Sequence, residues 1–536
     1  MVHRRAGVPS AIGREDEMGT EALFVLCVLA VLVAALMKDR MRPGMILLTG
    51  AVIFLCAGIL TPKEMLEGFS NKGMITVALL YLVSEGVRRS GVLEQLFHRL
   101  LPSEGVGVRA VQARLLPVVA FVSAFLNNTP VVVIFAPMIK RWAEGVRLPA
   151  TKFLIPLSYA TILGGVCTLI GTSTNLVVDG MVIDAGFEGF TMFELGKVGI
   201  FIALAGMAYL ILFSKYLLPA RRDIHDDDLP GEAAASGRYR RVEVVLGARF
   251  PAIGRRVGEL DFQRKYGARI MEVRRGGETF LMKDMRKLRY YEGDTLVLMA
   301  DDAFQQTWGD SSFFLMVAGG KESEPKLPKV KRTVALVLLV VMIAGATIGE
   351  LPSVRQAVPG VKLDMFFFAA VTTVIMAWLN IFPARKYTKY VSWDILITIA
   401  SAFAISKAMM NSGMADAIAE FTIGLTDSFG PYFLLAVIFI ITDLFTELMT
   451  NNAAAALAFP ISLSIAQHLG VDPTPFFVTI CMAASASFST PIGYQTNLIV
   501  QGVGGYKFAD FVRVGLPLNL ISLILSVTLI PLIWPF

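Results

Sequence analysis

The sequence predicts an α-helical polytopic membrane protein made of two inverted repeats, with a small α/β insert between them. Of its 536 residues, 55% are hydrophobic and 17% are charged, whereas soluble domains carry about 25% charged residues. Apolar runs near the length of a membrane helix, about 20 residues, recur along most of the chain. The same order of elements also occurs on both sides of a polar central segment. We therefore expect five transmembrane helices and one re-entrant hairpin in each repeat.

The first repeat is expected to span residues 20–220, behind a disordered tail at 1–19. Its membrane helices are marked by five apolar runs at 20–37, 44–60, 74–90, 153–180 and 192–217. A further apolar stretch at 113–139 is interrupted by Asn127-Asn128-Thr129 and by Pro130 and Pro137. Open backbone polar groups are costly in hydrocarbon, so such a break is tolerated only where it is buried or lines a cavity. We interpret 113–139 as two half-helices that meet at a polar tip.

The second repeat is expected to span residues 332–536 and to copy this layout. Its apolar runs lie at 333–350, 364–382, 392–410, 476–502 and 512–534, with an interrupted stretch at 431–466. Residues 168–180 match 490–502 at eight of thirteen positions with an offset of 322, and 127–129 align with 450–452 at an offset of 323. Two nearly equal offsets indicate an internal duplication.

Between the repeats, residues 221–331 form a polar linker and insert whose core is expected at 238–310. Alternating or apolar segments at 241–247, 268–274 and 294–300 are typical of strands, and Gly276-Gly277 signals a hairpin. A helix is expected at 254–266.

The charge of the loops predicts the orientation of the chain. Lys and Arg residues concentrate on one side of the expected membrane helices, which is the cytoplasmic side by the positive-inside rule. Five crossings per repeat then place both termini outside and the insert in the cytoplasm. We expect a multi-pass protein of the plasma (inner) membrane, in contact with lipid.

Several classes of function are excluded by the residues present. The net charge of +6 comes from loops beside apolar runs, so a nucleic-acid partner is not expected. The four cysteines lie singly in apolar stretches, and the four histidines are far apart, without a Ser/His/Asp or HExxH arrangement. The chain is therefore not expected to be an enzyme. A potassium channel would need a selectivity filter of the Thr-Val-Gly-Tyr-Gly type, which does not occur.

The two tips are the candidate binding sites. A helix N-terminus offers free N–H groups and the positive end of the helix dipole to an anion, while carbonyl and Asn side-chain oxygens suit a small hard cation. Glycines at 171 and 493 allow the nearby helices to unwind. The alternative is that these Asn and Thr residues only cap helices or join helix interfaces.

Four motifs in order, at 123–130, 168–175, 446–452 and 490–497, resemble those of the divalent anion:sodium symporter family, which carries dicarboxylates, citrate or sulfate. The resemblance covers everything outside the polar insert. It implies a homodimer, an elevator motion, and Na⁺ as the coupling ion. It implies a first Na⁺ site from Ser123, Asn127, Asn128 and Gly171, and a second from Thr446, Met449 (by its carbonyl), Asn451 and Gly493. It implies substrate contacts from Asn128, Thr129, Thr172, Asn451 and Asn452.

The sequence departs from the family pattern at the tips, which read Asn-Asn-Thr and Thr-Asn-Asn, and at Tyr494-Gln495-Thr496. The bulk of Tyr494, counted here among the substrate-binding residues, narrows the expected cavity. Amide and hydroxyl donors without a nearby Arg suit a compact tetrahedral oxyanion. We expect sulfate as the substrate, and a dicarboxylate such as succinate, or citrate, as the alternative. Outside the class of transporters, the alternative functions are an ion channel and a nutrient sensor.

Two further features have alternative interpretations. Asp443 and Glu447 lie four apart on one helix face; they predict either a proton relay or acceptors for backbone N–H groups of the hairpin.

The insert resembles the C-terminal subdomain of the RCK (TrkA-type) regulators of K⁺ channels, in Gly258-Glu-Leu260, Val273–Gly277 and Glu292-Gly-Asp294. That resemblance implies dimerisation and a small effector; the alternative is a packing element without a ligand.

Overall fold

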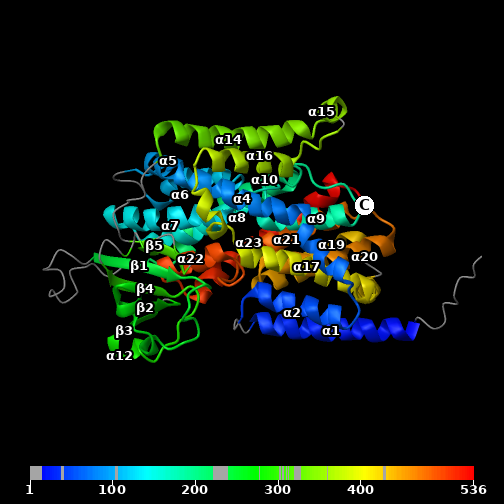
Figure 1. The fold of residues 1–536 in the computed structure, drawn as a ribbon, viewed down its shortest axis with the longest axis horizontal. Coiled ribbons are helices and arrows are strands. Elements are labelled where there is room, and N and C mark those ends of the chain that lie inside the picture. Colours follow the sequence, from blue (N-terminus) through cyan, green and yellow to red (C-terminus); the bar gives the residue numbers. More distant parts are fainter. Residues whose placement is uncertain are drawn as a thin grey trace, which may run out of the picture.

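A computed structural model describes the backbone of residues 15–536 except for 38–40, 103–106, 221–239, 277, 301–303, 305–306, 309–310, 312, 319–326, 359 and 427–429. In the described part, helices dominate and a single small sheet interrupts them (Figure 1). Six helices are long and apolar enough to cross a membrane, and three shorter ones are also apolar. The chain is a helical, polytopic membrane protein.

The helices before the insert follow the predicted order. They are α1 (Glu15–Met37), α2 (Pro43–Cys56), α3 (Pro62–Ser70), α4 (Lys72–Arg89), α5 (Val92–Leu100), α6 (Val108–Ser123), α7 (Asn128–Gly145), α8 (Leu154–Gly165), α9 (Ser173–Asp184) and α10 (Gly196–Leu217). The prediction missed α3, which a Thr61–Glu64 capping box starts, and the amphipathic α5. Helix α1 begins at Glu15, within the expected tail at 1–19, and residues 1–14 lie outside the described part.

The helices after the insert repeat this arrangement. They are α14 (Lys329–Gly349), α15 (Pro352–Ala357), α16 (Met365–Trp378), α17 (Trp393–Asn411), α18 (Met414–Thr426), α19 (Gly430–Leu448), α20 (Asn451–Leu469), α21 (Thr474–Ser485), α22 (Gln495–Gly504) and α23 (Phe508–Ile533). The pairs α6/α7 and α19/α20 are helical hairpins, as the interrupted apolar stretches predict. The predicted segments 153–180 and 476–502 are each broken into two helices.

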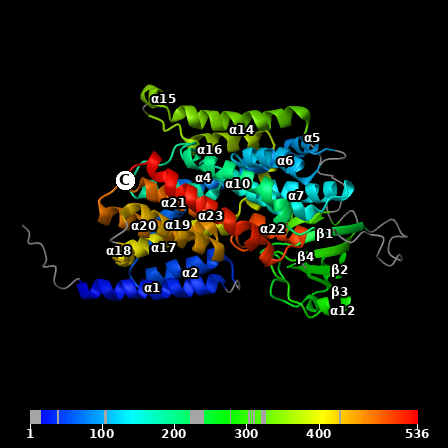
Figure 2. The same ribbon diagram turned by 180° about the vertical axis from the view of Figure 1, so that it is seen from behind.

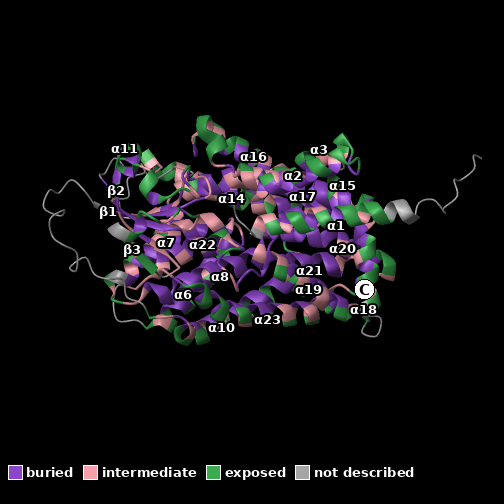
Figure 3. Ribbon diagram, turned by 90° about the horizontal axis from the view of Figure 1, so that it is seen from below, coloured by how far each residue is buried: buried purple, intermediate pink, exposed green. Residues whose placement is uncertain are grey.

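The two halves are interleaved, since helices of one half pack against helices of the other. Helix α17 packs on α2 and α3, α16 on α4, α10 on α23, α22 on α7 and α20 on α9. Buried residues concentrate along the middle of the bundle, including α8 and α21 (Figure 3). This interleaving brings equivalent parts of the two repeats to the same place.

The insert is an antiparallel sheet in the order β3-β2-β4-β1-β5. Its strands are β1 (Arg240–Leu246), β2 (Ala268–Arg275), β3 (Glu278–Leu281), β4 (Thr295–Ala300) and β5 (Phe314–Ala318). The three predicted strands and the hairpin after β2 are confirmed. Strand β5 lies beyond the predicted core at 238–310 and pairs with β1. We call residues 240–318 the insert.

The predicted single helix at 254–266 is broken into two short turns. Only a short 3-10 turn at Val257–Glu259 and α11 (Phe262–Tyr266) are helical. The segment before them pairs instead with the loop before β4, through bridges of Ile253 to Tyr290 and of Arg256 to Arg289. This tertiary pairing overrides the local helix preference. Both ribbon views place the sheet beside α7 and α22 at one end of the molecule (Figures 1 and 2).

Candidate functional site

The first hairpin brings a hydroxyl and an amide oxygen together at its tip. Helix α6 ends at Ser123 and α7 begins at Asn128. The hydroxyl of Ser123 donates to Oδ1 of Asn128 at 2.6 Å, and neither residue is exposed to solvent. A hydrogen bond across five residues therefore closes this turn and fixes the Asn128 amide.

The second hairpin has the same geometry. Helix α19 ends at Leu448 and α20 begins at Asn451. The hydroxyl of Thr446 donates to Oδ1 of Asn451 at 2.8 Å. Both donor and acceptor are offset by 323 residues from Ser123 and Asn128. The repeat seen in the sequence is thus also a repeat of side-chain contacts.

The broken helices α8/α9 and α21/α22 supply two irregular segments beside the tips. Each segment is held by an amide: Asn175 donates to the Thr168 carbonyl at 2.9 Å, and Asn497 donates to the Thr490 carbonyl at 3.1 Å. Glycine is required at 493, since a Cβ atom there would lie 2.2 Å from the carbonyl oxygen of Thr446. The backbone of this segment therefore approaches the second tip closely.

Glycine is required at the equivalent position of the first half as well. A Cβ atom on Gly171 would lie 2.5 Å from the carbonyl oxygen of Gly165. A Cβ atom on Gly165 would in turn lie 2.9 Å from Oδ1 of Asn128. The irregular segment and the first tip are thus packed without room for a side chain.

The hydroxyl of Tyr494 joins the two halves. The amide of Asn128 donates to it at 2.6 Å, and the hydroxyl of Thr172 lies 3.1 Å from it. The side chain of Asn451 also lies close to the Tyr494 hydroxyl. Thr172 and Tyr494 are the N-cap residues of α9 and α22 and are offset by 322 residues. Both tips and both broken helices therefore meet at one point.

Four helices begin at this meeting point. Helices α7 and α20 start with Asn128 and Asn451, and α9 and α22 start directly after Thr172 and Tyr494. A helix N-terminus carries free N–H groups and a partial positive charge, so it favours an anion. In the described part of the chain, none of the side-chain hydrogen bonds found at these four residues comes from a Lys, Arg or His. The arrangement suits an anion bound by helix ends, amides and hydroxyls.

The remaining predicted site residues lie around this point. Thr129 donates to Oε1 of Gln495 at 3.4 Å. Asn452 accepts from the hydroxyls of Ser173 at 3.3 Å and Thr174 at 3.2 Å on α9. Met449 is buried just after the end of α19.

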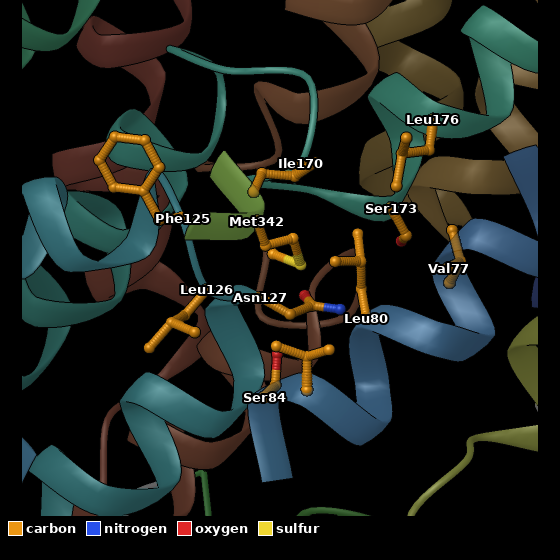
Figure 4. Close-up of a pocket in the computed structure, with 11 residues that line it drawn as sticks. Val77, Leu80, Ser84, Phe125, Leu126, Asn127, Ile170, Ser173, Leu176 and Met342 are labelled. Carbon is orange, nitrogen blue, oxygen red and sulfur yellow. The ribbon is translucent and has the colours of Figure 1, made fainter. Parts of the chain in front are cut away.

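Asn127, which is predicted to bind Na⁺ together with Ser123, Asn128 and Gly171, lies beside a residue of α4. Its side chain lies close to Tyr81 of α4, and it lines a small cavity. Figure 4 shows Asn127 in the middle of this cavity, near Leu80 and Met342. Most of the other residues that line it are apolar, with Ser84 and Ser173 among them. Asn127 and Asn128 therefore point to separate surroundings although they are adjacent.

Sequence reasoning missed four residues that contact the tips: Tyr81, Ser173, Thr174 and Gln495. Tyr81 comes from a helix outside both duplicated motifs, so no repeat marks it. The other three lie inside the motif segments at 168–180 and 490–502, where duplication was the available signal. Their contacts depend on how α9 and α22 approach the opposite repeat, which the sequence does not state.

The carboxylates near the second tip form a polar group with Asn519 of α23. The Asn519 amide lies 3.1 Å from Asp443 and 3.0 Å from Glu447. Glu447 also accepts the backbone N–H groups of Ser489 at 2.6 Å and Thr490 at 2.8 Å. Glu447 thus holds the irregular segment that leads to Tyr494. The sequence allowed either a proton relay or acceptors for backbone N–H groups, and the contacts of Glu447 favour the second interpretation.

Comparison with known proteins places the chain among transporters. The family described as "Citrate transporter" matches residues 28–475 and 448–535. An uncharacterized transporter of Synechocystis sp. is 29% identical, over 90% of this chain and 92% of its own length. A putative sulfur deprivation response regulator of Chlamydomonas reinhardtii is 27% identical over 90% and 96%. A probable sodium/sulfate cotransporter 3 of the same alga is 22% identical over 86% and 82%.

Proposed function

We propose a function that starts from one fact: this chain belongs to the citrate transporter family. The proposed function is sodium-coupled symport of a divalent oxyanion, with sulfate as the substrate. The observation that carries the proposal is the meeting of four helix N-termini at Tyr494, Asn128, Asn451 and Thr172. A divalent anion gains from each of these helix ends. The sodium/sulfate name of a relative supports the same substrate.

The size of the site favours a small anion over a long one. The Tyr494 hydroxyl lies between the Asn128 and Thr172 side chains and hydrogen-bonds to both. A compact oxyanion can take over these donors when the hydroxyl shifts. Substrate contacts are assigned to Asn128, Thr129, Thr172, Asn451, Asn452 and Tyr494.

Sodium ions are proposed as co-transported cargo. Ser123 with Asn128, and Thr446 with Asn451, each bring a hydroxyl and an amide oxygen within 2.8 Å of each other or closer. A small cation can be coordinated by both oxygens once the O–H group rotates so that its proton no longer points at the amide oxygen. The closely packed backbone at Gly171 and Gly493, together with the Met449 carbonyl, supplies further oxygens. Asn127, which faces Tyr81, is the weakest member of the first set.

Transport by an elevator motion of a homodimer is proposed together with this function, as is placement in the inner membrane with the insert in the cytoplasm. The charge of the loops supports the orientation. The insert is proposed to be an RCK-type regulatory module that dimerises and binds a small effector. Its compact antiparallel sheet with an aromatic core around Phe250 and Tyr290 supports a separate folded unit.

A dicarboxylate or citrate symporter is the second candidate, since the family itself is described as a citrate transporter. Uptake of radiolabelled sulfate, succinate and citrate into proteoliposomes separates the candidates. Sulfate uptake that needs an inward Na⁺ gradient, and that fails when choline replaces Na⁺ at fixed pH, supports the proposal. Na⁺-dependent uptake of succinate or citrate alone supports the second candidate. Flux without gradient dependence indicates a channel, and binding without flux indicates a sensor.

A further inference from the structure

Two helices lead directly from the candidate site to the insert. Helix α7 begins at Asn128, and Lys140 lies twelve residues further along it, which is about 18 Å of helix. Helix α22 begins directly after Tyr494, and Gly502 lies near its other end. The two helices also pack against each other. One end of this pair thus carries site residues, and the other end meets the sheet (Figures 1 and 2).

The contact with α7 is a buried ion pair. Lys140 Nζ lies 2.7 Å from Oε2 of Glu243 on β1, and their side chains are 8% and 15% exposed. Arg274 of β2 donates to the other carboxylate oxygen at 3.2 Å. Removing one partner of a buried, hydrogen-bonded pair leaves a charge without compensation. The sheet is therefore tied to α7 by a contact that is costly to break.

The contact with α22 depends on two glycines. A Cβ atom on Gly502 would lie 2.8 Å from Oγ1 of Thr295 and 3.0 Å from the Gly293 carbonyl oxygen. A Cβ atom on Gly293 would lie 2.9 Å from the Leu498 side chain. The helix and the insert therefore approach too closely at this point for a side chain on either glycine. Strand β5 also packs on α7, and β1 on α22.

We infer that the insert positions α7 and α22 and travels with them, so that the Lys140–Glu243 pair and the Gly293–Gly502 contact transmit the state of the insert to Asn128 and Tyr494. The inference rests on the proposed transport function for its activity readouts. It makes Lys140 and Glu243 positioning residues of the transport site. By the same inference, a ligand bound to the insert changes the affinity for the transported anion through these two contacts.

A cross-link tests whether the insert travels with α22. The double variant Thr295→Cys with Gly502→Cys brings two thiols close enough for a disulfide bond, in a full-length background whose four native cysteines are replaced by alanine. Its reduced form also carries a Cβ atom at position 502 and should share the raised KM of Gly502→Val, so the oxidised and reduced forms of this one variant are compared. Oxidation should form the bond and leave sulfate uptake within about twofold of the reduced protein. Loss of uptake on oxidation that reverses on reduction shows that the insert must detach, which overturns the inference. Failure of the bond to form overturns the contact itself.

Substitutions test the positioning role. Lys140→Met should raise the KM for sulfate about fivefold or more, while Lys140→Arg keeps the charge and should restore the KM. Gly502→Val should act like Lys140→Met. The matched controls are Gly424→Val, which faces open space on α18, and Arg249→Gln, which removes an insert charge attracted to Asp394 of α17. Both controls should leave the KM within about twofold of the unaltered protein.

Hydrogen exchange separates this inference from the proposed function. In purified full-length protein, Lys140→Met and Gly502→Val should speed amide exchange in the segments around Asn128 and Tyr494, with or without substrate. An unaltered protein that takes up no sulfate contradicts the proposed function but leaves this readout in place. Unchanged exchange at both segments, together with an unchanged KM, overturns the inference.

Discussion

Asn128 and Tyr494 are 366 residues apart in the chain, yet the amide of Asn128 donates to the Tyr494 hydroxyl at 2.6 Å. Asn128 begins α7 in the first half and Tyr494 caps α22 in the second half. The contact exists because the two halves interleave. It places one side chain at the centre of the candidate site, where its size decides what fits.

Tyr494→Thr should widen the site and shift its selectivity. The equivalent residue in the first half is Thr172, so the backbone at this position accepts a threonine. The ratio of succinate to sulfate uptake should rise about tenfold, the range expected when a pocket gains room for a few atoms. Competition between the two labelled anions in proteoliposomes measures it. Thr172→Ser is the control, and a full-activity Tyr494→Thr protein with an unaltered ratio would rule out Tyr494 as the size determinant.

Ser123→Ala and Thr446→Ala should each lower the apparent affinity of the transporter for Na⁺. Each removes the hydroxyl that lies against Asn128 or Asn451. Loss of one such oxygen costs about 1 kcal/mol, so the Na⁺ concentration for half-maximal uptake should rise about fivefold. Ser90→Ala removes a buried hydroxyl that bonds the Val87 carbonyl of α4 and is the control. If the control shifts the Na⁺ curve as much as the tip variants do, the two sites are misassigned.

Gly493→Ala should abolish uptake while the protein remains in the membrane. Its Cβ atom would lie 2.1 Å from Oγ of Ser487 and 2.2 Å from the Thr446 carbonyl oxygen. Contacts that short force the irregular segment away from the second tip. Gly424→Ala on α18, where nothing lies within 4 Å, should behave like the unaltered protein. Normal uptake by Gly493→Ala would mean that this close approach is not needed.

Glu447→Gln should destabilise the protein more than Asp443→Asn does. Glu447 accepts the N–H groups of Ser489 and Thr490 with its two oxygens, and a Gln amide can replace only one of them. The lost acceptor costs about 1–3 kcal/mol, visible in thermal unfolding of purified protein. Asp443 has its hydrogen bond from Asn519 alone, as far as its described partners show. Equal, small shifts for both variants, with uptake made insensitive to pH, would favour the proton relay instead.

Acid should weaken the contact between the insert and α7. Burial alone raises the pKa of Glu243, but attraction to Lys140 and Arg274 outweighs it and holds the pKa below the usual 4.5. A lowered folded pKa contributes stability that is present above the unfolded pKa and is lost as pH falls through the folded value. The stability difference between unaltered protein and Glu243→Gln should be constant near neutral pH and shrink below about pH 4.5. A difference that grows on acidification contradicts the assignment.

The sequence predicts the two hairpin tips and the broken helices, but it does not predict which other residues pack against them. The 322 and 323 offsets locate both hairpins and both broken helices, because duplication preserves the residues that close them. Tyr81 lies outside the duplicated motifs and reaches Asn127 through tertiary packing alone. The insert helix expected at 254–266 is broken, and its first residues pair with the segment around Arg289. Docking of Glu243 on Lys140 joins elements from separate parts of the chain, and no local pattern encodes it.

Na⁺-dependent binding of labelled sulfate to the purified protein tests the central claim most directly, because it requires no transport. The account predicts saturable binding that disappears when choline replaces Na⁺ and that is lost in Asn128→Ala and in Asn451→Ala alike, since one site uses both tips. Sulfate binding that survives either substitution at full affinity, in a protein that unfolds at the same temperature as the unaltered one, would contradict a shared site between the two halves.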